Sequence, residues 1–345
     1  MIKQVLSGLM SRVFASCVVM FGISILIFTM ARVIPGDPAR IALGPLATES
    51  QIQAMRTSRH LNDPIIVQYG FFLRDLSHGD LGHSFYTNRP VVVDIKQFFS
   101  ATFELVLFAG LLMVVIGLPL GIVSAHLRGR LGDDLARLVA LLGVCTPPFV
   151  WAVILQLCFA YFIPIFPLEG RLSFNQRTPE FYTGLYVIDS LLSADWIIFR
   201  ESIYHLVLPG TALALAAIGQ TARITRSNMV EIYGRPYIEM ARAYGFSPLT
   251  IAMRYAFRPA FIPTLTILGL DFAALLGNAF LVEKVFVWSG VSRYGVEVIL
   301  RKDLDAIVGT VLIIAAIFLV ANIVIDILVL YVNPRIRLTE TYQEQ

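Results

Sequence analysis

Long stretches without a charged side chain constrain this sequence more than any other feature. Each stretch reaches or nearly reaches the roughly 20 residues that a helix needs to cross a bilayer. Four of the stretches hold no Asp, Glu, Lys or Arg, and each of the other two holds one aspartate, Asp271 or Asp326. In chain order they cover residues 13–31, 105–125, 138–168, 202–222, 259–282 and 306–334. We therefore predict an all-α integral membrane protein with six transmembrane helices.

The composition argues against the soluble alternative, a globular protein with a large core of buried helices. Only 15% of the 345 residues are charged, whereas soluble domains carry about a quarter. The first apolar stretch is not followed by a small-x-small cleavage site, so we expect a retained helix and not a removable signal peptide.

Lysine and arginine are distributed unevenly between the two sides of the predicted bundle. An even number of spans places both termini on one side. If that side is the cytoplasm, the cytoplasmic segments hold thirteen basic residues, and the short outer loops 169–201 and 283–305 hold seven. The positive-inside rule therefore places both termini in the cytoplasm. The net charge of +3 reflects this topology and does not indicate a nucleic-acid partner.

Two local patterns predict how the spans bend and pack. Thr146-Pro147-Pro148 interrupts the third apolar stretch, and we expect a kink or a broken helix there because proline removes a backbone donor. Gly117-x-x-x-Gly121 in the second stretch has the small-residue spacing that lets two helices approach closely.

Motifs for nucleotide binding or hydrolysis do not occur in the sequence. It contains no G-x-x-x-x-G-K-[ST], no G-x-S-x-G and no H-E-x-x-H, so ATP-driven work would have to come from a partner. His78 and His83 lie five residues apart, but no third metal ligand is identifiable, and a solvated loop is expected. We predict no catalytic residue, no cofactor and no metal site.

Polar residues inside or beside the predicted spans are candidates for function. Thr264, Asp271 and Asn278 share one face of the fifth span at seven-residue spacing, and an ionisable group at that depth faces the bundle interior or water. This face lines a translocation path in one hypothesis and forms a structural interhelical hydrogen bond in the other. Glu104 is expected in the first turn of the second span, where a carboxylate suits the helix dipole. The role of Asp326 stays open.

Residues 234–259 form a charged segment between two apolar stretches, and their pattern predicts two short helices. Pro236 suits the first turn of a helix, and Gly245 suits a left-handed stop at its end. Ser247-Pro248 predicts the start of a second helix, which Pro259 is expected to limit. One face of the first helix carries Tyr237, Met240, Ala241 and Tyr244, and one face of the second carries Leu249, Ala252, Met253 and Ala256.

Glu239-Met240-Ala241 with Gly245 resembles the cytoplasmic E-A-A-x-x-x-G loop of permease subunits in binding-protein-dependent ABC importers. Further pieces narrow the resemblance to the dipeptide/oligopeptide/nickel permease family, and the long segment after the first span is similar to subunits of the dipeptide-permease B type. Taken in their order along the chain, with the predicted spans between them, these pieces are specific for this family and extend over essentially the whole chain. They are Ile34-Pro35-Gly36-Asp37-Pro38, Gly79-Asp80-Leu81-Gly82-x-Ser84, Arg223-x-x-Arg226-Ser227-x-Met229, Ala241-Arg242-Ala243-x-Gly245, Ile262-Pro263 and Asn333-Pro334-Arg335-Ile336-Arg337.

The resemblance implies the type I ABC importer permease fold (the MetI-like fold) in the bacterial inner membrane. It implies a second homologous permease as a heterodimer partner, two cytoplasmic ABC ATPase subunits, an extracytoplasmic solute-binding protein and surrounding lipid. The helix at 236–244 would dock into a groove on an ATPase, and the segment 236–257 would couple its motion to transport. The coupling residues would be Glu239, Ala241, Arg242 and Gly245.

The expected domain organisation follows from these spans and this resemblance. Residues 1–35 form an N-terminal transmembrane helix, and residues 36–97 form an extracytoplasmic segment. A five-helix permease core covers 98–334, with the coupling helices at 234–259, and 335–345 is a cytoplasmic tail.

Alternatives and departures from the family pattern accompany this interpretation. A secondary transporter or channel acting without ATP would predict more paired charges within the membrane. A membrane-embedded hydrolase would need a nucleophile–base motif, which this sequence lacks.

The sequence departs from the family pattern at several places. Met240 replaces an alanine of the pattern, Arg258-Pro259 ends the loop one place late, and Asp305 stands where proline is usual. The resemblance is compatible with peptides, nickel complexes, glutathione, opines or oligosaccharides as substrates.

Overall fold

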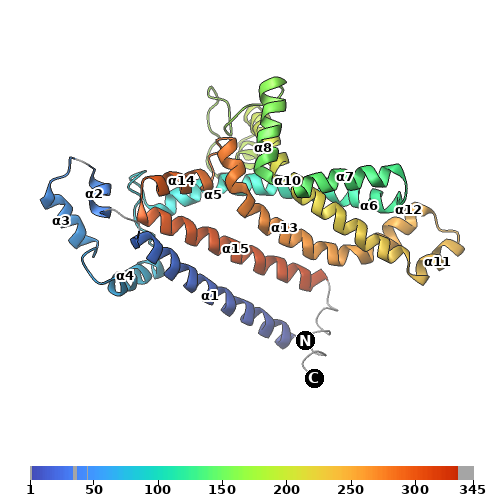
Figure 1. Cartoon of the computed structure of the whole chain (residues 1–345), viewed down its shortest axis with the longest axis horizontal. Helices are drawn as coiled ribbons and strands as arrows, with labels where there is room; N and C mark the ends of the chain where they lie inside the picture. Colours follow the sequence, from blue (N-terminus) through green and yellow to red (C-terminus); the bar gives the residue numbers. More distant parts are fainter. Residues whose placement is uncertain (1, 34–36, 45, 333–345) are drawn as a thin grey trace. The chain divides into compact units, whose positions relative to one another are not determined.

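The computed structural model describes residues 2–33, 37–44 and 46–332, which are almost entirely helical (Figure 1). These helices belong to two compact units, one from residues 1–101 with 289–323 and one from 102–288 with 324–345. Within the described residues the only β-type pairing is an isolated bridge between His83 and Pro90. The predicted pieces at 34–36 and 333–337 and the predicted tail at 335–345 lie outside the described residues.

The first unit contains the first apolar stretch, the predicted extracytoplasmic segment and parts of two longer helices. Tyr294 and Val298 are buried beside Val91 and Ala306, and a second apolar cluster joins Leu312 and its neighbours to α1. The helices are α1 (Ile2–Val33), α2 (Pro38–Leu43), α3 (Glu49–Ser58), α4 (Ile65–Ser77), the first part of α5 (Val91–Leu112), α14 (Val291–Leu300) and the first part of α15 (Leu304–Val332).

Side-chain caps define the short helices of this unit. Thr48 and Gln51 form a capping box at the start of α3, which satisfies backbone N–H groups that have no partner within the helix. Asp37 accepts a hydrogen bond from the backbone N–H of Ala39 at the start of α2 and pairs with Arg56 of α3 at 2.7 Å. The hydrogen bond from the Arg56 guanidinium holds the pKa of the Asp37 carboxyl below its usual range.

The second unit is built around one long helix, α10 (Trp196–Tyr233), which contacts α6, α7, α8, α9 and α13 (Figure 1). Many of its buried positions are alanine, glycine, serine or threonine, and such small residues allow close helix contacts in a membrane. The other elements are the rest of α5, α6 (Leu118–His126), α7 (Leu131–Cys145), α8 (Pro148–Gln156), α9 (Tyr186–Leu192), α11 (Pro236–Ala243), α12 (Pro248–Thr250), α13 (Arg258–Val285) and three π-helical segments, η1 (Met113–Gly117), η2 (Leu157–Phe162) and η3 (Ile251–Phe257).

The predicted close approach at the glycine pair is confirmed, and the partner helix is α10. A Cβ atom on Gly121 would lie 2.6 Å from the Thr225 side chain and 2.7 Å from the Ala222 carbonyl oxygen. A Cβ atom on Gly117 would lie 3.0 Å from the Thr221 side chain. Both glycines are therefore needed where α10 packs against this part of the chain.

The predicted break at Thr146-Pro147-Pro148 is also confirmed. The segments Leu131–Cys145 and Pro148–Phe162 meet at an angle of 104°. Five helices in the described chain are long and apolar enough to cross a membrane, or six spans if this bent pair counts as one. The spanning helices agree with the predicted apolar stretches.

The prediction for Glu104 is wrong, because the second span begins well before it. Helix α5 starts at Val91, so Glu104 lies in its interior and not in its first turn. The prediction started the second span where the charged residues end in the sequence. In the structure the helix already contains the charged residue Asp94, which is fully buried and pairs with Arg89 at 2.6 Å. A paired carboxylate does not end a helix, and α5 continues through it.

Candidate functional site

The segment after α10 forms the predicted helix–turn–helix, and its turn has the expected geometry. Gly245 has a φ of +76°, a conformation that an L side chain disfavours. The backbone N–H of Gly245 donates to the Arg242 carbonyl at 2.9 Å, and that of Phe246 donates to the Ala241 carbonyl at 3.2 Å. The Ser247 Oγ accepts from the Thr250 N–H at 3.2 Å. The helix end and the next helix start are therefore both capped locally.

One side of α11 is anchored to the rest of the second unit. Ile238, Ala241 and Ile251 are buried together, and Ile232, Tyr233 and Tyr255 pack around them. Because Ala241 lies on this inner side, its small side chain sets how closely α11 approaches η3. Among the predicted coupling residues, Ala241 is therefore buried and packs α11 against the rest of the unit.

The opposite side of α11 and the start of the second helix are exposed and rich in large apolar side chains. Met240 is 56% exposed, Tyr244 75% and Leu249 72%. Glu239 and Arg242 are exposed beside them. We call this set the coupling surface: Tyr237, Glu239, Met240, Arg242, Tyr244, Phe246, Leu249 and Met253.

The two predicted faces are only partly correct. Tyr237, Met240 and Tyr244 do share an exposed face, while Ala241 at its edge is buried. The face predicted for the second helix separates into the exposed Leu249 and Met253 and the buried Ala252 and Ala256. The π-helical turn of η3 is the reason, since its wider turn shifts the side chains away from the 3.6-residue period.

Pro259 does not limit the second helix, contrary to the prediction. The helical path runs from Pro248 through η3 and α13 to Val285. Pro259 lies in the first turn of α13, directly after the π-helical segment. A π-helical turn changes the hydrogen-bond register, so the backbone can accommodate a residue without an N–H. The coupling surface is therefore continuous with a spanning helix.

An ion pair fixes the end of α10 that leads to α11. The Arg226 Nε donates to Asp133 Oδ1 at 2.6 Å, and its Nη2 donates to Asp133 Oδ2 at 2.7 Å. Ser124 Oγ adds a third hydrogen bond to Asp133 at 2.7 Å. The sequence motif contained Arg226 but gave no indication of its partner, which lies 93 positions away.

The predicted face of α13 divides into a buried end and an exposed end. Thr264 is fully buried, donates to the Ala260 carbonyl at 2.8 Å and accepts from the Asn228 amide at 3.2 Å. Asp271 is partly buried, and its Oδ2 has no hydrogen-bond partner within the described chain. Asn278 is exposed, so the three residues share a helix but not an environment.

A buried charge cluster that the sequence did not indicate lies beside α5. Arg171 donates to Glu104 Oε2 at 2.5 Å and to the Gly184 carbonyl at 3.1 Å. Its guanidinium carbon lies 3.5 Å from the centroid of the Tyr186 ring. The Val187 backbone N–H donates to Glu104 Oε1 at 2.8 Å. Glu104 therefore holds the predicted outer loop in place by accepting from the first turn of α9, and it does not lie in the first turn of its own helix.

The two histidines considered as metal ligands lie in different local settings. His78 contacts the Arg74 carbonyl through Nδ1 at 2.8 Å, and His83 pairs with Pro90 in the isolated bridge. Within the residues described, no group of three or more His, Cys, Asp or Glu side chains is arranged to hold a metal ion. The side chain of Asp326 lies outside the described part of the structure.

Comparison with known proteins covers nearly the whole sequence. Residues 117–338 match the model of the "Binding-protein-dependent transport system inner membrane component" family, and residues 5–106 match the model of its N-terminal region. The sequence is 38% identical over 329 residues to the dipeptide transport system permease protein DppB of Alkalihalophilus pseudofirmus, covering 95% of this chain and 98% of that protein.

Two further relatives have related names. The probable D,D-dipeptide transport system permease protein DdpB of Escherichia coli K12 is 38% identical over 330 residues, covering 96% of this chain and 97% of the relative. The di/tripeptide transport system permease protein DppB of Pseudomonas aeruginosa is 36% identical over 318 residues, covering 92% of this chain and 94% of the relative.

Proposed function

This chain belongs to the family of inner-membrane components of binding-protein-dependent transport systems, and from this premise we propose that it forms half of the translocation path for dipeptide-sized solutes in an ATP-driven importer. The names of its relatives support this substrate class, since they refer to dipeptides, D,D-dipeptides and di- or tripeptides. The chain is a permease subunit of the inner membrane and transports solute without being an enzyme.

The coupling surface carries the proposal for how ATP hydrolysis drives transport. Exposed tyrosine, methionine and arginine side chains are typical of protein interfaces, and here they lie on a short helix that is anchored from beneath by Ile238 and Ile251. We assign this surface to a cytoplasmic ABC ATPase, with Glu239 and Arg242 as its polar contacts. The alternative, an amphipathic segment resting on lipid, fits less well with a charged pair in the middle of the surface.

Force on α11 has a direct route into the membrane helices. The inner side of α11 packs on Ile251 of η3, and η3 continues into α13 without a break. Tyr233 at the end of α10 packs on the same cluster. Because packed interfaces shift as rigid pieces and do not deform gradually, movement of α11 would tilt α10 and α13 together.

The exposed end of the α13 face is assigned to the translocation path. Asn278 is exposed, and the buried Oδ2 of Asp271 has no hydrogen-bond partner within the described chain. A second homologous permease facing α13 would complete the path and bring polar groups to this carboxylate. Thr264 has the structural role instead, because both of its hydrogen bonds are made to α10 and α13.

The remaining parts of the proposal concern the assembly and its orientation. Both termini lie in the cytoplasm, two ABC ATPases bind there, and a solute-binding protein delivers solute from outside. Residues 36–97 form the extracytoplasmic segment between the helix at 1–35 and the core at 98–334. The concentration of basic residues in the predicted cytoplasmic segments supports this orientation.

Copurification of the ATPases with the permease tests the coupling surface. Tyr244→Asp and Leu249→Asp place a charge in the middle of the proposed interface, and we expect each to reduce ATPase retention and ATP-dependent uptake at least about tenfold. Phe174→Asp is the matched control, since Phe174 is also a large exposed side chain, 100% exposed, but lies in the predicted outer loop. Normal ATPase retention and uptake in both variants would contradict the proposal.

A separate experiment distinguishes the importer from a transporter that needs no ATP. The purified chain is reconstituted alone and with its ATPases, and dipeptide uptake is measured with and without ATP. We expect uptake only in the complete assembly. Uptake by the chain alone would favour a secondary transporter or a channel.

A further inference from the structure

Helix α4 in the first unit is packed along a part of α1 that lies inside the membrane. The apolar span of α1 covers Met10–Arg32. The Tyr69 ring lies 5.3 Å from the Phe28 ring and 6.4 Å from the Phe21 ring, measured between centroids. The Tyr69 hydroxyl and the Ser24 hydroxyl are hydrogen-bonded at 2.8 Å. These contacts place α4 below the level at which α1 leaves the membrane.

The helix rise converts these contacts into a depth. Phe28 precedes Arg32 by four residues and Ser24 precedes it by eight, which corresponds to roughly 6 Å and 12 Å along α1 at about 1.5 Å per residue. Helices that lie in a membrane interface bury their apolar face by about 5–10 Å. The contact at Phe28 therefore falls in the depth range of an interfacial helix, and the contacts at Ser24 and Phe21 lie deeper.

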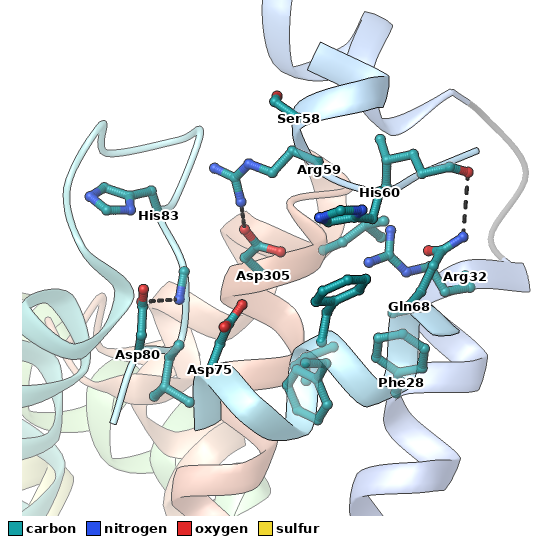
Figure 2. A pocket seen from close by; sticks show the side chains of 18 of the residues that line it. Phe28, Arg32, Ser58, Arg59, His60, Gln68, Asp75, Asp80, His83 and Asp305 are labelled. Carbon is teal, nitrogen blue, oxygen red and sulfur yellow. Dashed lines mark hydrogen bonds and ion pairs between the residues drawn. The ribbon is translucent and has the colours of Figure 1, made fainter. Parts of the chain in front are cut away.

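The side chains of α4 divide into three faces. Tyr69 and Phe72 face α1, where the Phe72 ring lies 5.2 Å from the Phe28 ring. Gln68 and Asp75 line a cavity of about 270 Å³ on the adjoining side (Figure 2), which Phe72 also lines. The third face carries Ile66, which is 84% exposed, and the partly buried Leu73, which lies seven residues later and so on the same side.

The cavity shows which side of α4 faces water. Arg32, Arg59 and Asp305 line it with Gln68 and Asp75 (Figure 2), and the Arg59 guanidinium is 2.5 Å from the Asp305 carboxylate. Such a concentration of charged groups requires hydration or pairing. The exposed aliphatic face of α4 is turned away from these groups.

The charge distribution along α4 agrees with this division. Its only charged residues are Arg74 and Asp75 near its end, and they pair at 3.0 Å. Its first turn instead exposes three successive aliphatic side chains, Ile65, Ile66 and Val67, at 51%, 84% and 42%. Successive residues point to different sides of a helix, so of these three only Ile66 lies on the third face, and it is the most exposed of them.

From this geometry we infer that α4 is an interfacial membrane helix whose Ile66–Leu73 face is embedded in the lipid of the leaflet where α1 ends. In the predicted topology this is the outer leaflet. The segment after the first span is then held by the lipid as well as by its contacts with α1. This fixes the height of the polar cavity relative to the bilayer. The occupant of the exposed face is lipid acyl chain, because α4 packs on the apolar span of α1 and its Ile66 side is turned away from the polar cavity.

Fluorescence quenching tests this inference in the complete transporter reconstituted in phosphatidylcholine nanodiscs. The native residues Cys17, Cys145 and Cys158 are replaced by alanine, and single cysteines are introduced by Ile66→Cys or Leu73→Cys and labelled with bimane. Leu46→Cys is the matched control, because Leu46 is also a large exposed side chain of the same segment, 95% exposed, but lies between α2 and α3.

We expect doxyl-labelled phosphatidylcholine to quench position 66 at least about three times more than position 46, and aqueous iodide to show the reverse order. Equal iodide quenching at 66 and 46 would place α4 in water and overturn the inference. Protection of positions 66 and 73 from both quenchers would also overturn it, because a protein partner would then cover the face. Ile66 is exposed enough that its variant alone decides the outcome if the Leu73 variant fails to assemble.

Discussion

Arg226 of α10 and Asp133 of α7 form a bidentate ion pair with N–O distances of 2.6 and 2.7 Å. The aspartate is only 2% exposed. The pair joins two helices of the second unit seven residues before α10 ends. The coupling surface begins directly afterwards, so this contact fixes the helix from which α11 projects. It is a bidentate polar link between α10 and α7.

We expect Asp133→Asn to destabilise the protein, because Arg226 would keep its charge in a partly buried place without a carboxylate. Breaking a buried pair by removing one partner costs about 3–5 kcal/mol. The thermal midpoint of the detergent-solubilised protein, followed by fluorescence-detected size exclusion, measures this loss. Asp134→Asn is the matched control, since Asp134 is 67% exposed and its loss should cost less than about 1 kcal/mol. Equal effects of the two variants would show that the pair contributes little.

We expect Gly121→Ala to separate α6 from α10, because the added Cβ would meet both the Thr225 side chain and the Ala222 carbonyl oxygen. Overpacking of this kind costs about 1–3 kcal/mol. Gly22→Ala is the control, since Gly22 on α1 has no atom within 4 Å of the new Cβ and alanine favours the helix. The same stability assay applies, and an unchanged midpoint for Gly121→Ala would contradict the observed packing.

We expect Arg171→Lys to weaken the predicted outer loop although the positive charge is kept. A lysine cannot bind the Glu104 carboxylate and the Gly184 carbonyl together while stacking on Tyr186, as the planar guanidinium does. We expect a loss of about 2–4 kcal/mol and faster proteolysis within residues 172–184. Arg177→Lys, at an exposed position of the same loop, should change neither quantity; a similar effect there would mean that the loop is simply sensitive to any substitution.

We expect Gly245→Val to reduce uptake while leaving the amount of membrane-inserted protein unchanged. The open space around Gly245 allows a side chain, so the cost comes only from its φ of +76° and amounts to about 1–2 kcal/mol for an ordinary residue. Gly245→Asn should retain most uptake, because asparagine adopts this conformation more readily. The ratio of uptake to ATP hydrolysis in proteoliposomes measures the effect, and normal coupling with valine would remove the turn from the proposed mechanism.

We expect single cysteines on α13 to differ in their reaction with a polar, membrane-impermeant thiol reagent. In the assembled transporter, Asn278→Cys should react, and Asp271→Cys should react when dipeptide is absent and be protected when it is present. Thr264→Cys should stay unreactive, because Thr264 is fully buried. The rate of labelling gives the comparison. Complete protection of positions 271 and 278 under all conditions would remove this face from the translocation path.

Local sequence patterns predicted the features that depend on near neighbours in the chain. The break at Thr146-Pro147-Pro148 follows from proline chemistry within one turn, and the stop at Gly245 follows from the backbone freedom of a single residue. Gly117-x-x-x-Gly121 predicted a close helix contact but not its partner. A spacing rule describes one surface of one helix, so the second surface stays unknown until the fold is known.

The errors have a common origin in burial and helix register, which simple charge and proline rules do not describe. Glu104 was expected at a helix start because charge was used to mark the membrane boundary, whereas a buried Asp94 paired with Arg89 lets α5 begin earlier. Pro259 was expected to end a helix, and the π-helical register of η3 accommodates it instead. Arg89 and Asp94 are close in the sequence, but only the fold shows that Asp94 is fully buried and that the turn before Pro259 is π-helical.

The sequence by itself determined that this protein is a bundle of membrane-spanning helices of the permease family, because charge-free stretches and short motifs act through each residue's own chemistry. Only the tertiary structure decided which charges pair, since Arg226 and Asp133 are 93 positions apart and Glu104 and Arg171 are 67 apart. It also decided which sides of α11 and α4 stay exposed. An amphipathic pattern states that a helix has two unlike faces, and only the packing of other helices determines which face remains for an ATPase or for lipid.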